Sequence, residues 1–429
     1  MIIVDTALKR RAAEGRPVRV AMVGAGYMAR GIALQIETAI QGMELVGIAN
    51  RTPAGARDCF ADAGVTEVSE ARTREDAEAA IAAGRRVVTE DPGILCRADG
   101  VDAVVEITGA VEFGAHVTLE AIDAGKHVVL VNAELDATIG PILKQYADRA
   151  GVVITNADGD EPGVTMNLYR FVDTLGYRPV LTGNIKGFYD PRRNPDTQKG
   201  FAEATGQEPK MVTSFADGTK LSMETCIVAN ATGFKVGKRG MYGPSPAHVN
   251  DVMEHFDGDR LLQGGLVDFV LGAQPGSGAF VVGYNDHPIK KKYMSYFKMG
   301  DGPFYVFYRP FHLPQLEVPL TVARAVLFGD AAVAPRNGPS CDVITIAKQD
   351  LRAGEQLDGI GGFSCYGTIE NYEVSRAGDI LPMGLSEGCI VTRDVKIDEA
   401  ISYADVELPE GRLADKLRSE LVETFPGDV

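Results

Sequence analysis

Two lysines in the middle of the chain stand where chemistry on a carbonyl or alcohol group needs a cation. Lys186 lies near the end of a strand-like segment, in GNIKGFYDP, and Lys220 lies in the first turn of a helix predicted over residues 214–233. A lysine ammonium stabilises a developing alkoxide, and its pKa falls on burial, so it can also transfer a proton. The helix dipole disfavours a cation in the first turn, which favours a functional role for Lys220.

A carboxylate and an amide follow Lys220 on the same predicted helix. Glu224 lies four residues later on the same face, and Asn230 lies further along, off that stripe. A surface ion pair is the alternative reading of Lys220 and Glu224, although Lys before Glu is the poorer order for such a pair. We therefore predict four catalytic residues: Lys220, Lys186, Glu224 and Asn230.

Five further cations gather in two loops: Arg192, Arg193, Lys235, Lys238 and Arg239. The chain has a net charge of −16 and does not attract anions over a distance, so any phosphate or carboxylate site must be local. We predict that these cations clamp an anionic substrate group; ordinary solvated loop charges are the alternative.

A cluster of acids lies in NADGDEPG, residues 156–163. Asp158, Asp160 and Glu161 are oxygen ligands of the kind that Mg²⁺ or Mn²⁺ accepts, so they are a candidate divalent-cation site. The alternative is that they cap the helix that follows. None of the six histidines has a zinc-ligand spacing.

The segment VGAGYMARG has the GxGxxA form of a dinucleotide-binding turn, with Gly24, Gly26 and Ala29. Gly24 permits the tight turn, Gly26 permits backbone to approach a pyrophosphate, and Ala29 permits close packing of helix on sheet. The free N–H groups of the helix N-terminus then attract the phosphates. The segment follows a predicted strand and opens a predicted helix, which favours cofactor binding over a structural turn.

The second strand ends in Asn50-Arg51-Thr52, where NAD-binding proteins commonly carry an acid that accepts hydrogen bonds from the ribose. An acid would repel a 2′-phosphate, whereas Arg51, and Arg57 further along, can pair with one. The trio resembles the NADP-selective NRT loop of shikimate dehydrogenases, although the rest of the chain does not. We predict NADP(H); the alternative is that both arginines are ordinary surface charges.

Two later strand ends complete the predicted cofactor site. Thr108 and Gly109 end EITGA, and Asn132 and Glu134 lie in VNAELD, at the edge where open parallel sheets bind ligands. Glu134 has an alternative role as a carboxylate leading a helix. The full set of predicted cofactor contacts is Gly24, Gly26, Tyr27, Met28, Asn50, Arg51, Thr52, Arg57, Thr108, Gly109, Asn132 and Glu134.

The elements that must position these residues alternate in the first part of the chain. Strand-like runs and helix-like stretches follow one another from residue 18 to 156, which predicts an α/β Rossmann domain with a doubly wound parallel sheet. Later segments predict a mixed α/β catalytic domain, and an Ala-, Pro- and Gly-rich stretch near residue 336 separates a third part of short strands and a terminal helix. The predicted domains are 1–163, 164–336 and 337–429.

Composition excludes several classes of function. The negative net charge argues against a nucleic-acid partner, and no run reaches the roughly 18 apolar residues of a membrane span. The N-terminus does not have the order of a signal peptide, so we expect a cytoplasmic location. Six scattered cysteines without a CxxC are expected to be reduced and mostly buried. We expect a small-molecule substrate and a homo-oligomer, a dimer or tetramer.

With SFADGTK, ANATG, FYRPFHL and AKQDLRAGEQLDGIGG in view, nearly the whole chain resembles the 1-deoxy-D-xylulose 5-phosphate reductoisomerase-like family. These proteins are relatives of homoserine dehydrogenase with a C-terminal SAF (β-clip) domain, here about residues 338–408. The resemblance implies NADPH-dependent chemistry. The reductoisomerase branch has a Lys-Gly-Thr-Lys run where this chain reads GNIKG, so the resemblance indicates the type of reaction and not the substrate.

Three hypotheses follow from these observations. The leading one is an NADP(H)-dependent oxidoreductase acting on a small anionic polyol or carbonyl compound, with a reductoisomerase-like activity in which a divalent metal would hold two substrate oxygens. The second is a homoserine dehydrogenase-type oxidation of an alcohol. The third is a non-catalytic NADP-binding sensor, against which the lysine-bearing helix argues.

Overall fold

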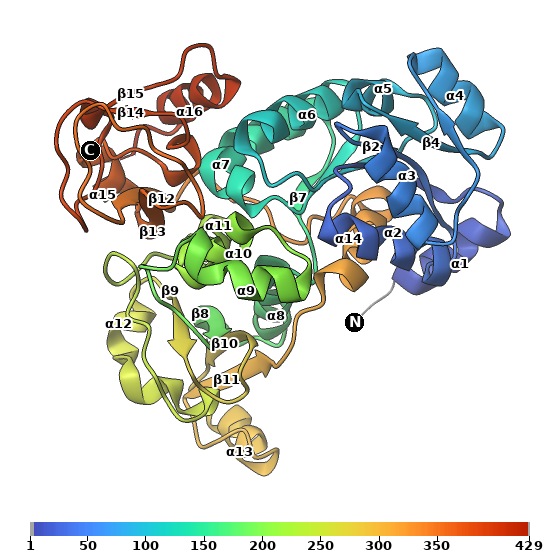
Figure 1. The fold of residues 1–429 in the computed structure, drawn as a ribbon. Helices are drawn as coiled ribbons and strands as arrows, with labels where there is room; N and C mark the ends of the chain where they lie inside the picture. Colours follow the sequence, from blue (N-terminus) through green and yellow to red (C-terminus); the bar gives the residue numbers. More distant parts are fainter. Residues whose placement is uncertain (1–3, 428–429) are drawn as a thin grey trace. The chain divides into compact units, whose positions relative to one another are not determined.

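A computed structural model of the protein describes residues 4–427 of the 429. The chain forms two compact units (Figure 1). Within the described residues, unit 1 comprises residues 4–160, 313–334 and 416–418, and unit 2 comprises residues 161–312, 335–415 and 419–427. The segment 313–334, which the sequence places with the catalytic part, is thus in unit 1. The division at 163 and 336 stays a prediction.

Unit 1 is built on a seven-stranded parallel sheet in the order β3-β4-β2-β1-β5-β6-β7. Its strands are β1 (Val18–Val23), β2 (Met43–Ala49), β3 (Val68–Glu70), β4 (Arg86–Thr89), β5 (Ala103–Glu106), β6 (His127–Leu130) and β7 (Ile154–Asn156). The strands β2, β4 and β3 lie on one side of β1, and the later strands β5, β6 and β7 lie on the other side of β1. This is the doubly wound topology, and ligands bind such sheets where the strand order reverses. The predicted fold class is confirmed.

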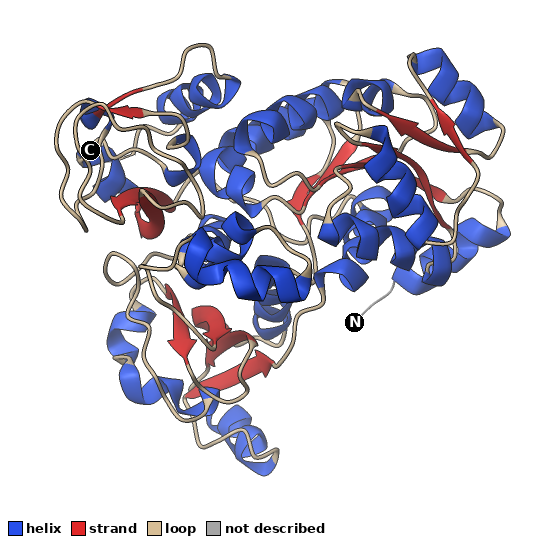
Figure 2. Cartoon of the chain, viewed as in Figure 1, coloured by secondary structure: helices blue, strands red, loops and turns tan. Residues whose placement is uncertain are grey.

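Helices cover both faces of this sheet (Figure 2). They are α1 (Val4–Ala13), α2 (Tyr27–Ala39), α3 (Pro53–Asp62), α4 (Arg74–Ala82), α5 (Pro92–Arg97), α6 (Val111–Asp123), α7 (Ala133–Ala150) and α14 (Pro314–Phe328). Helices α1 and α2 pack against α14, α3 packs against α2, and α4 to α7 pack in series with one another. Helix α14 thus arrives from a distant part of the sequence to complete one layer.

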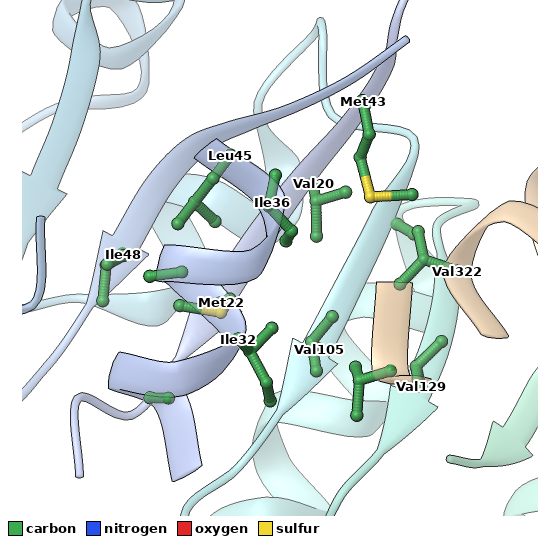
Figure 3. Packing of buried hydrophobic residues seen from close by; sticks show 14 of the residues in the cluster. Val20, Met22, Ile32, Ile36, Met43, Leu45, Ile48, Val105, Val129 and Val322 are labelled. Carbon is green, nitrogen blue, oxygen red and sulfur yellow. The ribbon is translucent and has the colours of Figure 1, made fainter. Parts of the chain in front are cut away.

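The core of that layer explains why α14 belongs to unit 1 (Figure 3). Ile32 and Ile36 of α2 meet Met22 of β1, Val105 of β5 and Val322 of α14, and all five are at most 2% exposed. Full burial of each such side chain contributes about 1.5–3 kcal/mol. Because α14 is apolar on the face that meets α2, leaving the layer would expose that face to water.

Unit 2 contains a four-stranded mixed sheet in the order β11-β10-β8-β9. Its strands are β8 (Arg178–Lys186), β9 (Leu266–Leu271), β10 (Gly278–Tyr284) and β11 (Phe304–Arg309). The remaining strands of unit 2 form two short antiparallel pairs, β12 (Cys341–Ala347) with β13 (Cys365–Asn371) and β14 (Ile390–Val391) with β15 (Val406–Glu407). That the latter strands form a SAF domain stays a prediction.

The α-helices of this part of the chain are α8 (Glu161–Thr174), α9 (Pro195–Thr205), α10 (Pro209–Ala216), α11 (Thr219–Thr232), α12 (Gly258–Leu262), α13 (Pro288–Tyr296), α15 (Tyr372–Ala377) and the terminal α16 (Leu413–Thr424). Helix α8 packs on β8, β10 and β11, and α11 packs against both the four-stranded sheet and the β12–β13 pair. Every residue of α11 except Lys220 is buried. A helix enclosed on all sides holds its side chains in fixed places.

The structure divides one predicted helix into two and shows a further helix after one of the predicted loops. The segment predicted as one helix over residues 214–233 contains parts of two helices. Gly218 adopts φ +90°, and this conformation interrupts the helical backbone between α10 and α11. Gly233, with φ +80°, ends α11 as predicted. The predicted loop that carries Arg192 and Arg193 is followed directly by α9, where Asn194 caps the helix and Pro195 occupies its first turn.

Candidate functional site

The glycine turn of unit 1 has the geometry that a dinucleotide needs. Gly24 adopts φ +113°, and a Cβ there would lie 3.2 Å from the Ile107 carbonyl oxygen. Gly26 precedes α2, where no side chain caps the helix, and a Cβ there would meet no atom within 4 Å. Tyr27 and Met28 are the first two residues of α2. The free N–H groups and open space fit a pyrophosphate.

After β2, Arg51 is exposed, and hydrogen bonds between Asn50 and Thr52 stabilise the turn. The Asn50 side-chain amide donates to the Thr52 carbonyl at 2.9 Å and to its hydroxyl at 3.1 Å. Arg51 is exposed and forms no ion pair within residues 4–427. Arg57 differs from the prediction, because its guanidinium pairs with Glu70 at 2.6 Å. This leaves Arg51 as the better-placed cation for a phosphate.

A buried carboxylate organises the other two predicted strand ends. Glu106, the last residue of β5, accepts hydrogen bonds from the Thr108 backbone N–H and from the Asn132 amide, both at 2.8 Å, and from the Thr108 hydroxyl. Asn132 in turn caps α7 by accepting from the Leu135 N–H at 3.0 Å. Burial raises the pKa of Glu106 to about 6. The network fixes the ends of β5 and β6 beside each other.

The remaining predicted contacts lie on the same strand ends. Gly109 adopts φ +68° just after Thr108. Glu134 lies in the first turn of α7 and is buried, so it occupies the position that its alternative role as a helix-leading carboxylate predicts. These two residues, with Thr108 and Asn132, border the point where the strand order of the sheet reverses.

Unit 2 brings together two glutamates and two lysines from three elements. Glu161 begins α8, Lys186 ends β8, and Lys220 and Glu224 lie on α11. The Lys186 ammonium donates to Glu161 at 2.7 Å and lies 3.5 Å from a Glu224 oxygen. The Lys220 ammonium lies 4.0 Å from the other Glu224 oxygen. Three of the four predicted catalytic residues therefore meet in one cluster, in which the glutamates are buried and the lysines are partly exposed.

The surroundings of Glu224 in this cluster change its acidity. Burial is the main cause, and the neighbouring Glu161 adds to it, while Lys186 and Lys220 oppose the shift; the pKa of Glu224 rises to about 8. Two carboxylates that share a site cannot both ionise easily. At neutral pH Glu224 therefore holds a proton in a site with two ammonium groups. A carboxyl group that keeps its proton at this pH can act as a general acid.

Two members of the cluster were not predicted from the sequence. The Asn184 amide, on β8, donates to the same Glu161 oxygen that Lys186 contacts. The His312 Nε2 atom lies 3.9 Å from the other Glu161 oxygen, and its Nδ1 atom is buried without a hydrogen-bond partner. Asn184 and Lys186 are two residues apart on one strand and so share a face, which was a readable signal. Nothing in FYRPFHL singles out His312.

Asn230 does not belong to the cluster. Its side-chain oxygen accepts hydrogen bonds from the backbone N–H groups of Ser340 at 2.7 Å and Cys341 at 3.1 Å. It is buried and ties α11 to the start of β12. Because Asn230 is six residues from Glu224, it points to another side of the helix. Its observed hydrogen bonds are structural, and the catalytic role stays a prediction.

The predicted anion clamp is also not formed. Arg192 pairs with Asp398, Arg193 with Asp190 at 3.1 Å, Lys235 with Glu373 at 2.6 Å, and Arg239 with Glu370 at 2.8 Å. Lys238 lies over the Tyr242 ring, 5.5 Å from its centroid. Because carboxylates neutralise four of the five charges, these residues resemble ordinary loop charges, which was the alternative interpretation.

The acidic cluster does not gather as a metal site. Asp158 is held by Arg324 at 3.0 Å, and Glu161 is held by Asn184 and Lys186. Asp160, between them, is buried. Within residues 4–427 no group of three or more His, Cys, Asp or Glu side chains is arranged to hold a metal ion. The predicted role of Asp158, Asp160 and Glu161 as a cation site is therefore not supported by their arrangement.

Two further properties bear on the class of protein. All six cysteines are buried, and burial raises the pKa of Cys59 and Cys96 to about 12, which suits inert thiols and not nucleophiles. Among the described residues, no helix has the length and apolar character needed to cross a bilayer.

Two family models match different parts of the chain. Residues 18–130 match the oxidoreductase family with an NAD-binding Rossmann fold. Residues 159–318 match the catalytic domain of oxidoreductase DRL. The chain is therefore an NAD(P)-dependent oxidoreductase. The first match covers the glycine turn, and the second covers every residue of the glutamate–lysine cluster.

Curated relatives and solved structures are more distant. The 1-deoxy-D-xylulose 5-phosphate reductoisomerases of Chlorobium phaeobacteroides and Exiguobacterium sibiricum are 25% and 26% identical, over 42% and 38% of this chain. The chain spans less than half the length of these relatives, 48% and 41%. A probable dehydrogenase from Thermotoga maritima and scyllo-inositol dehydrogenase from Lactobacillus casei are both 14% identical, with TM-scores of 0.44 and 0.43. Each covers 73% of this chain, which covers 90% and 89% of theirs.

Proposed function

We propose that the protein is an NADP(H)-dependent oxidoreductase that interconverts a carbonyl and an alcohol on a small, phosphorylated substrate. The observation that carries the proposal is the buried pair Glu161–Glu224 held between Lys186 and Lys220. A cluster of the same residues on the surface would be hydrated, and water would screen its charges. Two ammonium groups beside a carboxyl group that keeps its proton at neutral pH are suited to a substrate oxygen that gains negative charge.

The chain's own residues account for the proton and charge side of such a reaction. A bound nicotinamide cofactor supplies or accepts the hydride at the carbon atom. In the direction of reduction, Lys186 and Lys220 stabilise the alkoxide that forms on the carbonyl oxygen, and Glu224 donates the proton that converts it to a hydroxyl. Glu161, held by Asn184 and Lys186, keeps the lysine in place and, through its own charge, keeps Glu224 protonated.

Preference for NADP(H) rests on Asn50, Arg51 and Thr52. The end of β2 has no carboxylate that would repel a 2′-phosphate, and the exposed Arg51 supplies a cation for one. The brace between Asn50 and Thr52 holds the turn in shape without using Arg51. Arg57 is not part of this proposal because it is paired with Glu70.

A reductoisomerase-like activity is the finer form of the proposal. It is supported by the match to the DRL catalytic domain and by the names of the two curated relatives. Such a reaction rearranges the carbon skeleton before the hydride is transferred, and it needs two adjacent substrate oxygens to be polarised. Lys186 and Lys220 are two cations at one site, and we assign this role to them and not to a divalent ion.

A turnover screen tests the proposal. The full chain is incubated with NADPH and a panel of phosphorylated and plain hydroxyketones, and with NADP and homoserine, while the absorbance of the reduced nicotinamide is followed. We expect oxidation of NADPH with a phosphorylated hydroxyketone. Turnover of homoserine alone would instead favour the homoserine dehydrogenase-type reaction, and tight binding of NADPH without any turnover would favour a sensor.

A further inference from the structure

Helix α13, which connects β10 to β11, is attached to the rest of unit 2 along one side (Figure 1). None of its residues is buried. The Lys290 ammonium donates to the carbonyl oxygens of Leu175 and Gly176, both at 3.1 Å. Met294, one turn later, packs against the hydrophobic cluster that contains Tyr177. Within the part of the chain that the structure describes, most of the remaining surface of α13 faces solvent.

The exposed side of α13 carries an aromatic stripe at the spacing of one helix face. Its members, at positions i, i+4, i+7 and i+8, are Ile289, Tyr293, Tyr296 and Phe297. Each residue is between 57% and 78% exposed, and the ring centroids of Tyr296 and Phe297 lie 5.1 Å apart. Single exposed apolar residues are normal, but a contiguous patch marks an interaction surface. A helix that presents such a row offers the anchors with which helices dock into protein partners.

Positive charge borders the aromatic stripe. Lys291 and Lys292 lie on the same helix, Lys298 follows it, and none of these three lysines forms an ion pair within residues 4–427. The chain as a whole has a net charge of −16. Membranes and nucleic acids present dense negative charge over areas larger than the stripe, and the remainder of the chain would be repelled by it. The charges therefore favour a local acidic patch on a protein as the partner.

Unit 2 has such an acidic stretch close to α13. Its exposed carboxylates, which form no ion pair among the described residues, are Glu254, Asp257 and Asp259. Gly258, between the two aspartates, lies against the Phe304 ring, and a Cβ at Gly258 would lie 2.6 Å from that ring. Phe304 is paired with Tyr284, the last residue of β10, four residues before α13 begins. The acidic stretch and the aromatic stripe therefore both lie near the same end of β10.

We propose that the aromatic stripe is the interface of a two-fold symmetric dimer, in which a second copy of this chain covers it. Because the stripe and the acidic stretch lie close together on one copy, a two-fold axis lets the two stripes meet while the lysines of each copy face the acidic stretch of the other. An aromatic side chain buries about 150–250 Å². Two stripes together therefore supply on the order of 1,000 Å², which reaches the size of a specific protein–protein interface.

Analytical ultracentrifugation of the full chain, without cofactor or substrate, tests the interface. We expect the wild type to sediment as a dimer at micromolar concentration. Tyr296→Ser should raise the dissociation constant of the dimer about 100-fold, because an aromatic anchor of the interface is lost. Phe201→Ser is the matched control, because Phe201 is an aromatic residue of α9 with 59% exposure, outside the stripe, and it should sediment as the wild type does. Thermal unfolding shows whether each variant is folded.

A charge exchange identifies the partner as a second copy. Lys291→Glu together with Lys292→Glu should weaken the dimer about tenfold, since like charges then face each other across the interface. Glu254→Lys together with Asp259→Lys should weaken it for the same reason. A chain that carries both pairs of changes regains the attraction and should dimerise within about threefold of the wild type. Such rescue in a pure sample requires that both surfaces belong to the same protein.

Each outcome decides for or against this interface. A wild type that stays monomeric, a dimer that Tyr296→Ser leaves unchanged, or weakening by both charge exchanges without rescue would overturn it. Binding of a wild-type monomer to vesicles of phosphatidylserine and phosphatidylcholine, lost in Tyr296→Ser, would assign the stripe to a membrane surface instead. The proposed function stands or fails separately, because sedimentation needs no turnover, and a failed turnover screen would leave the dimer and its variants unchanged.

Discussion

The cofactor turn of unit 1 and the glutamate–lysine cluster of unit 2 are built in opposite ways. The turn uses backbone N–H groups, open space at Gly26 and the exposed Arg51. The cluster uses side chains, and its two glutamates are only 2% and 4% exposed. A cofactor that must enter and leave is bound through groups that water can also reach, whereas proton chemistry gains from burial, which strengthens electrostatic interactions and shifts pKa values.

The sharpest way to separate the two regions is to remove a charge from the cluster. In Lys220→Met, kcat should fall by about 10²- to 10⁴-fold, because the developing alkoxide loses a cation. NADPH affinity, measured by fluorescence titration, should stay as in the wild type. Lys238→Met removes an exposed loop lysine and is the control. Full activity in Lys220→Met would refute the assignment of the cluster.

The converse change is made in the cofactor turn. Arg51→Asp should reduce the preference for NADP over NAD by about 10- to 100-fold, since it removes a charge-assisted hydrogen bond and adds repulsion. The kcat/KM values for the two cofactors measure this. The kcat with saturating cofactor should change little. An unchanged cofactor preference would mean that Arg51 is an ordinary surface charge.

A smaller effect is expected from Glu106, which supports the cofactor edge without facing solvent. Glu106→Gln replaces an acceptor of three hydrogen bonds by an amide that places a donor against Thr108 or Asn132. We expect NADPH to bind about tenfold more weakly, as one charged-group hydrogen bond is lost. Thermal unfolding shows whether the variant is folded, and unchanged affinity in a folded variant would remove Glu106 from the site.

The smallest effect is expected in the loops of the predicted anion clamp, where Arg192 already has an ion-pair partner. The Arg192–Asp398 pair is exposed, and such pairs contribute about 0–1 kcal/mol to stability. Arg192→Met should therefore leave KM for the best substrate within about twofold and change the free energy of unfolding by less than about 1 kcal/mol. A tenfold rise in KM would return the loop to the substrate site.

Local signals predicted the cofactor region well. The strand, glycine turn and helix from Val18 to Ala39 follow one another in sequence, so periodicity and motif suffice to place them. The glutamate–lysine cluster was predicted in part, because Lys186, Lys220 and Glu224 are marked by chemistry and position. Asn184 shares a strand face with Lys186, which the spacing of the two residues encodes, but His312 joins them from a distant segment that no local pattern marks.

The roles predicted for the loop cations and for Asn230 stay predictions, and the structure gives these residues partners that the sequence does not reveal. The loop cations and Asn230 have residue types suited to function, but their partners are far away in sequence: Arg192 pairs with Asp398, and Asn230 with the backbone at Ser340. Whether a charged side chain is free or neutralised depends on these tertiary partners. For the same reason, the sequence did not show that Glu161, read as a metal ligand, contacts Lys186 instead.

The pH dependence of kcat for NADPH-driven reduction, measured in the wild type and in Glu224→Gln, tests the central claim most directly. Reduction needs the protonated form of Glu224, whose pKa burial raises to about 8, so wild-type kcat should be level below that pH and fall about tenfold per unit above it. Glu224→Gln cannot titrate there, and its lower activity should be flat over the same range. A fall near pH 8 that persists in Glu224→Gln would contradict the assignment of Glu224 as the proton donor.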